Sequence, residues 1–210
     1  MFNQLTGGIP SSFMRLQSLK RLDLAANLLT GTIPEFGNGN VDQQLDLEYL
    51  SLYQNMLDGP LPESMTSSSM LLQRLETLQL GDNALSGSIP STINALESLL
   101  TVIIELNNLH GTLPTTIGNL NYLVYLNLAS NSITGTIPTE VGQLTSMRYI
   151  HISSNQLSGQ LPSAFGNCVS LSGFQVDKNP LTGTVPSSFE NLPALGKLIG
   201  RKVVPLAVRL

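Results

Sequence analysis

Few residues in this 210-residue chain have the types and spacing that catalysis or metal binding requires. The only histidines are His110 and His151, and the single cysteine, Cys168, has no second cysteine for a disulfide or a zinc site. The sequence contains no G-x-S-x-G elbow, no G-x-x-x-x-G-K-[ST] phosphate loop and no protein-kinase signature. It therefore predicts a protein that is not an enzyme and that needs no metal or cofactor.

The composition narrows the class of partner. Charged residues make up 11% of the chain and the formal net charge is −4, so no basic surface offers the counterion release that drives binding to nucleic acid. There is no run of eighteen apolar residues, and the first residues lack a basic segment followed by an apolar one. We therefore expect no nucleic-acid partner, and neither a membrane span nor a signal peptide within the chain.

An internal repeat organises almost the whole sequence. The motif N-x-L-[ST]-G-x-[IL]-P, with small variations, recurs along the chain, and its asparagines are separated by 24 or 28 residues. Apolar residues lie five and three positions before each asparagine from the second onward, which predicts a short strand whose alternate side chains point inward. These inward pairs are Leu22 and Leu24, Leu50 and Leu52, Leu78 and Leu80, Val102 and Ile104, Leu126 and Leu128, Ile150 and Ile152, and Phe174 and Val176.

The repeated asparagine is expected to have a structural role. A coil that turns sharply after its strand leaves backbone N–H and C=O groups inside the stack, and an amide side chain can satisfy both kinds. Stacked coils would then form a ladder of asparagines. The glycine four positions later permits a positive φ, and the proline seven positions later ends the extended segment. The predicted ladder consists of Asn27, Asn55, Asn83, Asn107, Asn131, Asn155 and Asn179.

The L-x-L pair followed by N-x-L-[ST]-G-x-[IL]-P resembles the plant-type leucine-rich repeat. This resemblance implies an α/β repeat solenoid, a right-handed superhelix with a parallel concave sheet and a convex side that is irregular or 3-10 helical. It also implies a non-catalytic module that binds a protein or peptide, as in the ectodomains of receptor-like kinases and receptor-like proteins. Members of the family also include secreted inhibitors of cell-wall-degrading enzymes.

The resemblance leaves the context of the chain open. A receptor-like protein at the cell surface or outside the cell is the first hypothesis, and its full-length gene would carry a transmembrane helix or a kinase domain. The alternative is a cytoplasmic scaffold or a secreted enzyme inhibitor on the same solenoid. Met1 directly precedes a motif that belongs in the middle of a repeat, so we expect a fragment.

We expect two segments, an array of about eight repeats over residues 1–198 and a divergent tail over 199–210. Two repeats are longer by four residues, through 35–44 and 63–70, on the convex side. We interpret these insertions as tolerated surface loops.

Side chains six and four positions before each asparagine should face outward from the concave sheet. Three of the five tyrosines, Tyr49, Tyr125 and Tyr149, occupy the first of these columns, and Tyr53 lies nearby. Tyrosine offers a large contact area with a polar tip, which favours a binding role. Ile103 and His151 occupy the second column. We predict that these residues contact the partner.

Charges along the same wall are uneven. Glu48, Glu76 and Glu105 follow one another in the middle strands, and Arg148 lies near the end. This pattern predicts a partner with a basic centre, and we include these four residues in the predicted binding set. The alternative interpretation is that they are ordinary solvated charges on a sheet surface.

Overall fold

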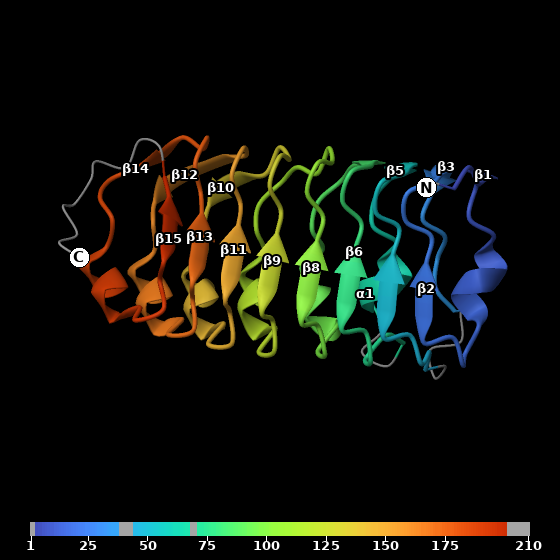
Figure 1. Ribbon diagram of the computed structural model, residues 1–210, viewed down its shortest axis with the longest axis horizontal. Coiled ribbons are helices and arrows are strands. Elements are labelled where there is room, and N and C mark those ends of the chain that lie inside the picture. Colours follow the sequence, from blue (N-terminus) through green and yellow to red (C-terminus); the bar gives the residue numbers. More distant parts are fainter. Residues whose placement is uncertain (1–2, 38–43, 68–70, 201–210) are drawn as a thin grey trace.

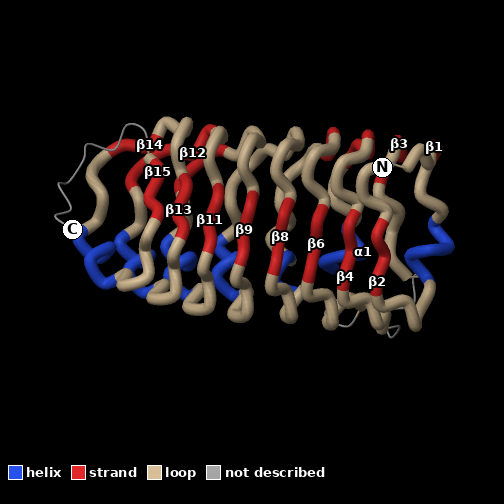
Figure 2. Tube along the Cα trace, viewed as in Figure 1, coloured by secondary structure: helices blue, strands red, loops and turns tan. Residues whose placement is uncertain are grey.

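The structure is a computed structural model, and it describes residues 3–37, 44–67 and 71–200. The chain winds through successive coils that stack side by side in chain order from one end of the molecule to the other (Figure 1). Each coil places a strand on one face, and short helices lie behind these strands (Figure 2). The predicted fold class, a leucine-rich repeat solenoid with a parallel sheet, is confirmed.

Eight parallel strands form the main sheet, which we call the concave sheet; their order is β15-β13-β11-β9-β8-β6-β4-β2. Equivalent positions of neighbouring coils lie opposite one another, as Leu126 does with Ile150. The last strand is one more than the seven inward pairs predicted, and it includes Ile199, the first residue of the expected tail 199–210. Residues 201–210 of that tail lie outside the described residues. The strands are β2 (Arg21–Asp23), β4 (Tyr49–Ser51), β6 (Thr77–Gln79), β8 (Thr101–Ile103), β9 (Tyr125–Asn127), β11 (Tyr149–His151), β13 (Gly173–Gln175) and β15 (Lys197–Ile199).

The inward side chains of these strands form one continuous core. Nearly all of the predicted inward residues are buried, and Leu24 is half-buried at the N-terminal end. At the other end, the rings of Phe165, Phe174 and Phe189 pack edge to face, with centroids 4.8–6.1 Å apart. Burial of this apolar surface is the main term that stabilises the stack, since each coil is too small to enclose a core alone.

The predicted asparagines connect each coil to the one before it. Asn131 is typical: its Oδ1 accepts a hydrogen bond from the backbone N–H of Leu109 at 3.0 Å, and its Nδ2 donates to the carbonyls of Ile104 and Leu128. Each of these asparagines thus bonds to its own coil and to the preceding coil. The same pattern occurs at Asn27, Asn55, Asn83, Asn107, Asn155 and Asn179, where at Asn27 the link to the preceding coil is the bond from the Leu5 N–H.

Replacing Asn131 with Ala is expected to lower the free energy of unfolding by about 1–3 kcal/mol, because one N–H and three carbonyl groups lose a partner inside the stack. Urea denaturation monitored by circular dichroism would measure the loss. The control is Asn119→Ala, since Asn119 is exposed on the helical side. Equal stability of the two variants would show that the ladder contributes nothing.

A second set of short parallel strands follows the asparagines. Two of its sheets have the orders β1-β3-β5-β7 and β10-β12-β14, and single bridges at Ser88–His110 and Thr112–Thr134 continue the pairing between them. The sequence interpretation did not include these strands. They are β1 (Thr6–Gly7), β3 (Leu28–Thr32), β5 (Met56–Gly59), β7 (Ala84–Leu85), β10 (Thr134–Thr136), β12 (Gln156–Gln160) and β14 (Leu181–Thr182).

Left-handed backbone occurs at two positions of the repeat. The glycine four residues after each asparagine has a φ between 72° and 82°, as expected. The residue directly before the asparagine also has a positive φ, between 53° and 56°, although it is never glycine. This second position was not predicted, because nothing in the residue types, from Ala26 to Lys178, shows the conformation.

On the other side of the stack, a short helix follows the proline in seven coils, and the described residues between Pro34 and β4 form no helix. These helices are η1 (Ser11–Arg15), α1 (Glu63–Ser67), η2 (Ile93–Ala95), η3 (Thr115–Asn119), η4 (Thr139–Gln143), η5 (Ser163–Asn167) and η6 (Ser187–Asn191). Gly142 of η4 lies so close to the next coil that a Cβ atom there would be 2.6 Å from the carbonyl oxygen of Ala164. Gly118 and Gly166 face their next coils in the same way. These glycines permit the tight stacking of the helices.

Gly142→Ala is expected to destabilise the chain by about 1–3 kcal/mol, because the new methyl group overlaps backbone that cannot move independently of its coil. Gly196→Ala is the matched control, since a Cβ there would meet nothing within 4 Å. Thermal melting of both variants tests this. If Gly142→Ala melted at the same temperature as the parent, the close approach of η4 to the next coil would not require glycine.

The two insertions contribute to the core, which corrects their interpretation as mere surface loops. Phe36 is 3% exposed, and Met65 of α1 is fully buried. The insertions also contact each other, since the backbone N–H of Phe36 donates to Ser64 Oγ at 2.7 Å. Residues 38–43 and 68–70 of the insertions lie outside the described residues.

Candidate ligand-binding face

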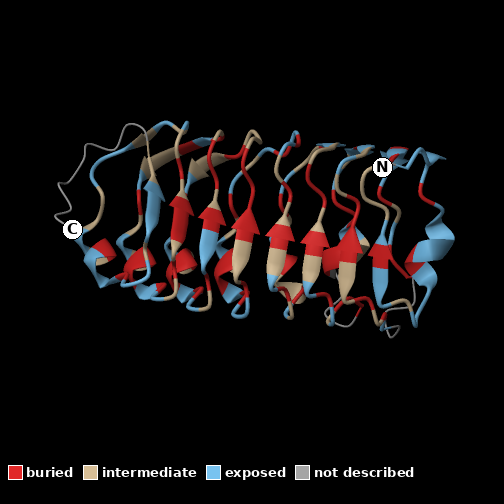
Figure 3. Ribbon diagram, viewed as in Figure 1, coloured by how far each residue is buried: buried red, intermediate tan, exposed pale blue. Residues whose placement is uncertain are grey.

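The outward residues of the concave sheet form the candidate face. From β2 to β13 the middle residue of each strand in this sheet is buried and most of its neighbours are exposed or half-buried, as in β2, β6 and β11 (Figure 3). In the last strand, β15, the middle residue Leu198 is 40% exposed. With strands about 4.8 Å apart, eight of them make a face about 35 Å wide. The predicted residues do lie on this face. Three groups of them differ in how far their polar groups are already satisfied, and the remaining ones lie in an apolar strip and at a positive end.

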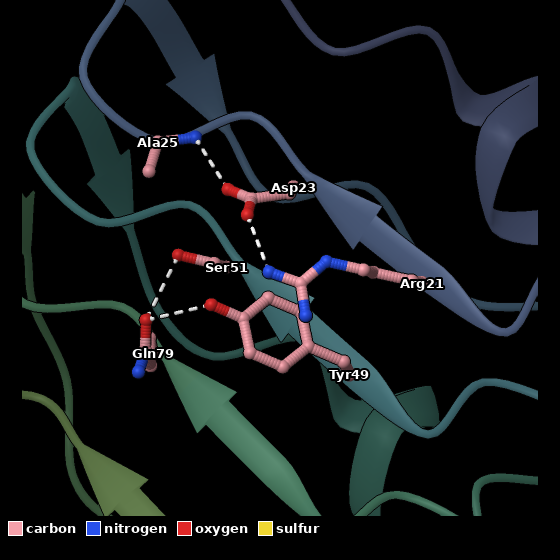
Figure 4. Close-up of polar contacts among 6 residues, drawn as sticks. All are labelled: Arg21, Asp23, Ala25, Tyr49, Ser51 and Gln79. Carbon is pink, nitrogen blue, oxygen red and sulfur yellow. Dashed lines mark hydrogen bonds and ion pairs between the residues drawn. The ribbon is translucent and has the colours of Figure 1, made fainter.

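The first group surrounds Tyr49 at the N-terminal end and is internally satisfied (Figure 4). The guanidinium of Arg21 lies 3.5 Å from the centroid of the Tyr49 ring and bonds to Asp23 at 2.8 Å. The Tyr49 hydroxyl donates to Gln79 Oε1 at 3.1 Å, and Ser51 Oγ donates to the same oxygen. Tyr49 thus has partners within the chain on its ring face and at its hydroxyl, which makes it a weaker anchor for a ligand than predicted.

Gln79 was missed by the sequence interpretation, although it links two strands. It lies in the outward column four residues before Asn83, where a polar residue able to accept two hydrogen bonds was the available signal. Glu48, in contrast, was predicted and pairs with Lys20 at 3.0 Å, with both side chains well exposed. Such a surface pair contributes little to stability, and its charge is already compensated.

The second group is an open aromatic pair, Tyr125 and Tyr149. Parallel pairing places them directly opposite each other on β9 and β11, and their ring centroids are 5.9 Å apart. Tyr149 is 49% exposed, and its ring lies over Gly173, where a Cβ would be 2.5 Å from the ring. No hydrogen bond of either hydroxyl to another described residue is present. This pair therefore presents large, rigid and unsatisfied side chains.

An apolar strip borders the aromatic pair. Ile103 is half-exposed on β8, and Leu100 and Leu106 on either side of that strand are 37% and 48% exposed. All three are exposed or half-exposed, and the outward position of Ile103 is the one that the sequence predicted. Exposed apolar residues grouped in this way are costly in water unless they are covered, which is typical of an interaction surface.

The third group contains the uncompensated acids of the middle strands. Burial raises the pKa of Glu105; a hydrogen bond from its own backbone opposes this shift, and the charge of Asp82 adds to it. Burial also raises the pKa of Tyr53 and of Tyr125, and Glu105 contributes to both shifts. Glu76 is exposed, and among the described residues none of these three carboxylates has a salt bridge. The centre of the face is therefore negative.

The opposite end of the face is positive. Arg148, Lys178 and Lys197 are exposed. Burial lowers the pKa of His151; Asp177 opposes this shift and Lys197 adds to it. Asp177 itself accepts a hydrogen bond from Ser153 Oγ at 2.5 Å. His151 is therefore neutral near pH 7 and offers a polar ring without a charge.

The described residues contain no group of three or more metal-binding side chains. Cys168 is buried, which raises its pKa to about 11, and its Sγ contacts the carbonyl of Val141 at 3.3 Å. A thiol in this environment is a packing residue and a poor nucleophile. Within the described part of the chain, no helix is long and apolar enough to cross a membrane.

Comparison with known families agrees with this architecture. The Leucine rich repeat family model matches residues 97–157, and a second model with the same description matches residues 18–39 and 74–96. No curated protein sequence is similar enough to count as a match. The chain belongs to the leucine-rich repeat family, and its repeats are of the plant type.

Solved structures of plant receptors are similar over most of the chain. The plant peptide hormone receptor RGFR1, in complex with RGF2, has 34% identity and a TM-score of 0.84 over 94% of this chain. The Arabidopsis receptor kinase HAESA, in complex with the peptide hormone IDA and the co-receptor SERK1, has 28% identity and a TM-score of 0.84 over 94%. The ectodomain of GASSHO1/SCHENGEN3 from Arabidopsis thaliana has 34% identity and a TM-score of 0.73 over 93%. This chain covers 30%, 32% and 26% of those chains, respectively.

Proposed function

We propose that the chain binds an extended peptide or a protein segment through its concave face, as the ligand-recognition part of a receptor-like protein. The observation that carries this proposal is the open pair Tyr125 and Tyr149 on the solvent side of the sheet. Outward strand positions are under no packing demand. A pair of unsatisfied aromatic rings next to an exposed apolar strip is the composition of a binding hot spot.

The relatives support the class of ligand. RGFR1 and HAESA were solved with peptides, RGF2 and IDA, and HAESA also with a co-receptor. We propose the same class of partner for this chain, acting by shape and side-chain complementarity with no chemical step. A location outside the cell and a longer protein that includes a membrane anchor and a kinase domain belong to the same proposal. The alternative is a scaffold or a secreted enzyme inhibitor on the same fold.

Selection of a displayed random dodecapeptide library on the purified chain tests the proposal. The bound region would be mapped by hydrogen exchange with a selected peptide. We expect protection to concentrate in β8, β9 and β11, where the tyrosines and Ile103 lie. Protection confined to α1 and the helices η2–η6 would move the site to the convex side, and failure to select any peptide would count against peptide binding altogether.

A further inference from the structure

The uncompensated carboxylate of Glu105 lies beside Gly81 of the preceding coil. Tyr53, Gly81 and Glu105 occupy the same position in three successive coils, which the backbone hydrogen bonds Gln54–Gly81 and Asp82–Glu105, both 2.9 Å, hold side by side. Gly81 has no side chain. A Cβ built there would lie 2.9 Å from Glu105 Oε2 and 3.0 Å from Tyr53 Cε2. Glu105 Oε2 and Tyr53 Cε2 therefore lie on either side of the space above the glycine, at most about 6 Å from each other.

This carboxylate has no cation beside it among the described residues. Glu105 Oε2 is buried and has no hydrogen-bond partner among the described residues. Tyr53 lies beside the carboxylate, and the charge of Glu105 raises the pKa of both Tyr53 and Tyr125. A carboxylate that is partly removed from water, with no cation beside it and one oxygen buried without a donor, is unfavourable. A cation placed against it would gain a charge-assisted hydrogen bond and contact with the faces of the rings.

The same chain contains a filled version of this arrangement. At the N-terminal end of the face, a tyrosine ring and a carboxylate, Tyr49 and Asp23, hold the guanidinium of Arg21 between them (Figure 4). At Glu105 the carboxylate and the rings are present and the cation is absent. Nor do the described lysines and arginines supply one, because none forms a salt bridge with Glu105.

We propose that Tyr53, Glu105 and Tyr125 form a subsite for the basic side chain, arginine or lysine, of a peptide bound on the concave face. This inference rests on the proposed function and specifies the chemistry of its ligand. The occupant is a peptide with a positive charge opposite β8, because the central acids are uncompensated while Glu48 and Asp23 are already paired. The guanidinium or ammonium group enters beside the Glu105 carboxylate and lies against the two rings.

The test compares dodecapeptides selected from a random library on the parent chain and on Glu105→Gln. We expect one peptide position to be enriched in arginine or lysine on the parent and not on the variant. For a selected peptide with arginine there, Glu105→Gln should weaken binding about tenfold or more, and so should replacement of that arginine by the neutral isostere citrulline. The two changes together should cost little more than either alone, because they remove the same interaction.

The controls separate folding from binding. Glu97→Gln makes the same change at an exposed position outside the concave sheet and should leave affinity unchanged. Burial raises the pKa of Glu105, which means that ionisation of this side chain is less favourable in the folded chain than in the unfolded chain. The charged group therefore lowers the free energy of unfolding at neutral pH. Glu105→Gln should therefore melt at the parent temperature or above it.

The possible failures are distinguishable. Two results would overturn the subsite and leave the proposed function intact. One is a selected peptide whose binding depends on Tyr149 but is unaffected by Glu105→Gln. The other is that the losses of affinity from Glu105→Gln and from the citrulline peptide add up. Peptides whose binding does not depend on Tyr149, or no selected peptides at all, would overturn both.

Discussion

Replacement of Leu126 by Ala is expected to lower the free energy of unfolding by about 2–5 kcal/mol, because the surrounding coils cannot close fully around the cavity left behind. Leu126 is 4% exposed at the centre of β9, opposite Val102 on β8 and Ile150 on β11. A cavity here weakens the contacts of one coil with both of its neighbours. Urea denaturation followed by circular dichroism measures the change.

Leu126→Ala should also reduce the cooperativity of unfolding, since a repeat array is held together by interfaces between adjacent coils. The matched control is Leu100→Ala, because Leu100 is 37% exposed. We expect the control to stay within about 0.5 kcal/mol of the parent. If Leu126→Ala unfolded at the same urea concentration as this control, the assignment of the inward side chains would be wrong.

The double variant Tyr125→Ala, Tyr149→Ala is expected to weaken binding of a selected peptide about tenfold or more. Removal of an aromatic anchor at the centre of an interface commonly costs 2 kcal/mol or more of binding free energy, while removal of a neighbouring side chain costs little. Both side chains point outward, so the melting temperature should change little. Isothermal titration calorimetry of the parent and variant with the same peptide gives the two affinities.

The control for this prediction is Tyr122→Ala, since Tyr122 is 64% exposed in the turn before β9 and not on the concave sheet. It removes the same ring from the same repeat and should leave binding unchanged. Ser67, Ser68 and Ser69 would be natural convex controls, but the placement of these side chains lies outside what the structure describes. Binding lost in Glu63→Ala but kept in the tyrosine variant would place the partner on the insertion.

The sequence alone was sufficient for the fold because each coil repeats the same local chemistry. The spacing of the asparagines defines the coil, and the apolar pairs before them predict both the strands and their inward faces. The asparagine hydrogen bonds follow from the same repeat, since identical residues in successive coils must stack. The outward positions of Ile103, Tyr125 and Tyr149 could likewise be counted from the asparagines.

Only the tertiary structure decided which outward residues are free to bind. Tyr49 and Tyr125 occupy the same position of the repeat, yet Arg21 and Gln79 already engage Tyr49 while Tyr125 stays open. Likewise, Gly81 is unremarkable in sequence, but its missing side chain lets Glu105 approach Tyr53. These contacts join residues 24 to 52 positions apart. Their geometry depends on side-chain conformations across neighbouring coils, which the repeat pattern of a single coil does not specify.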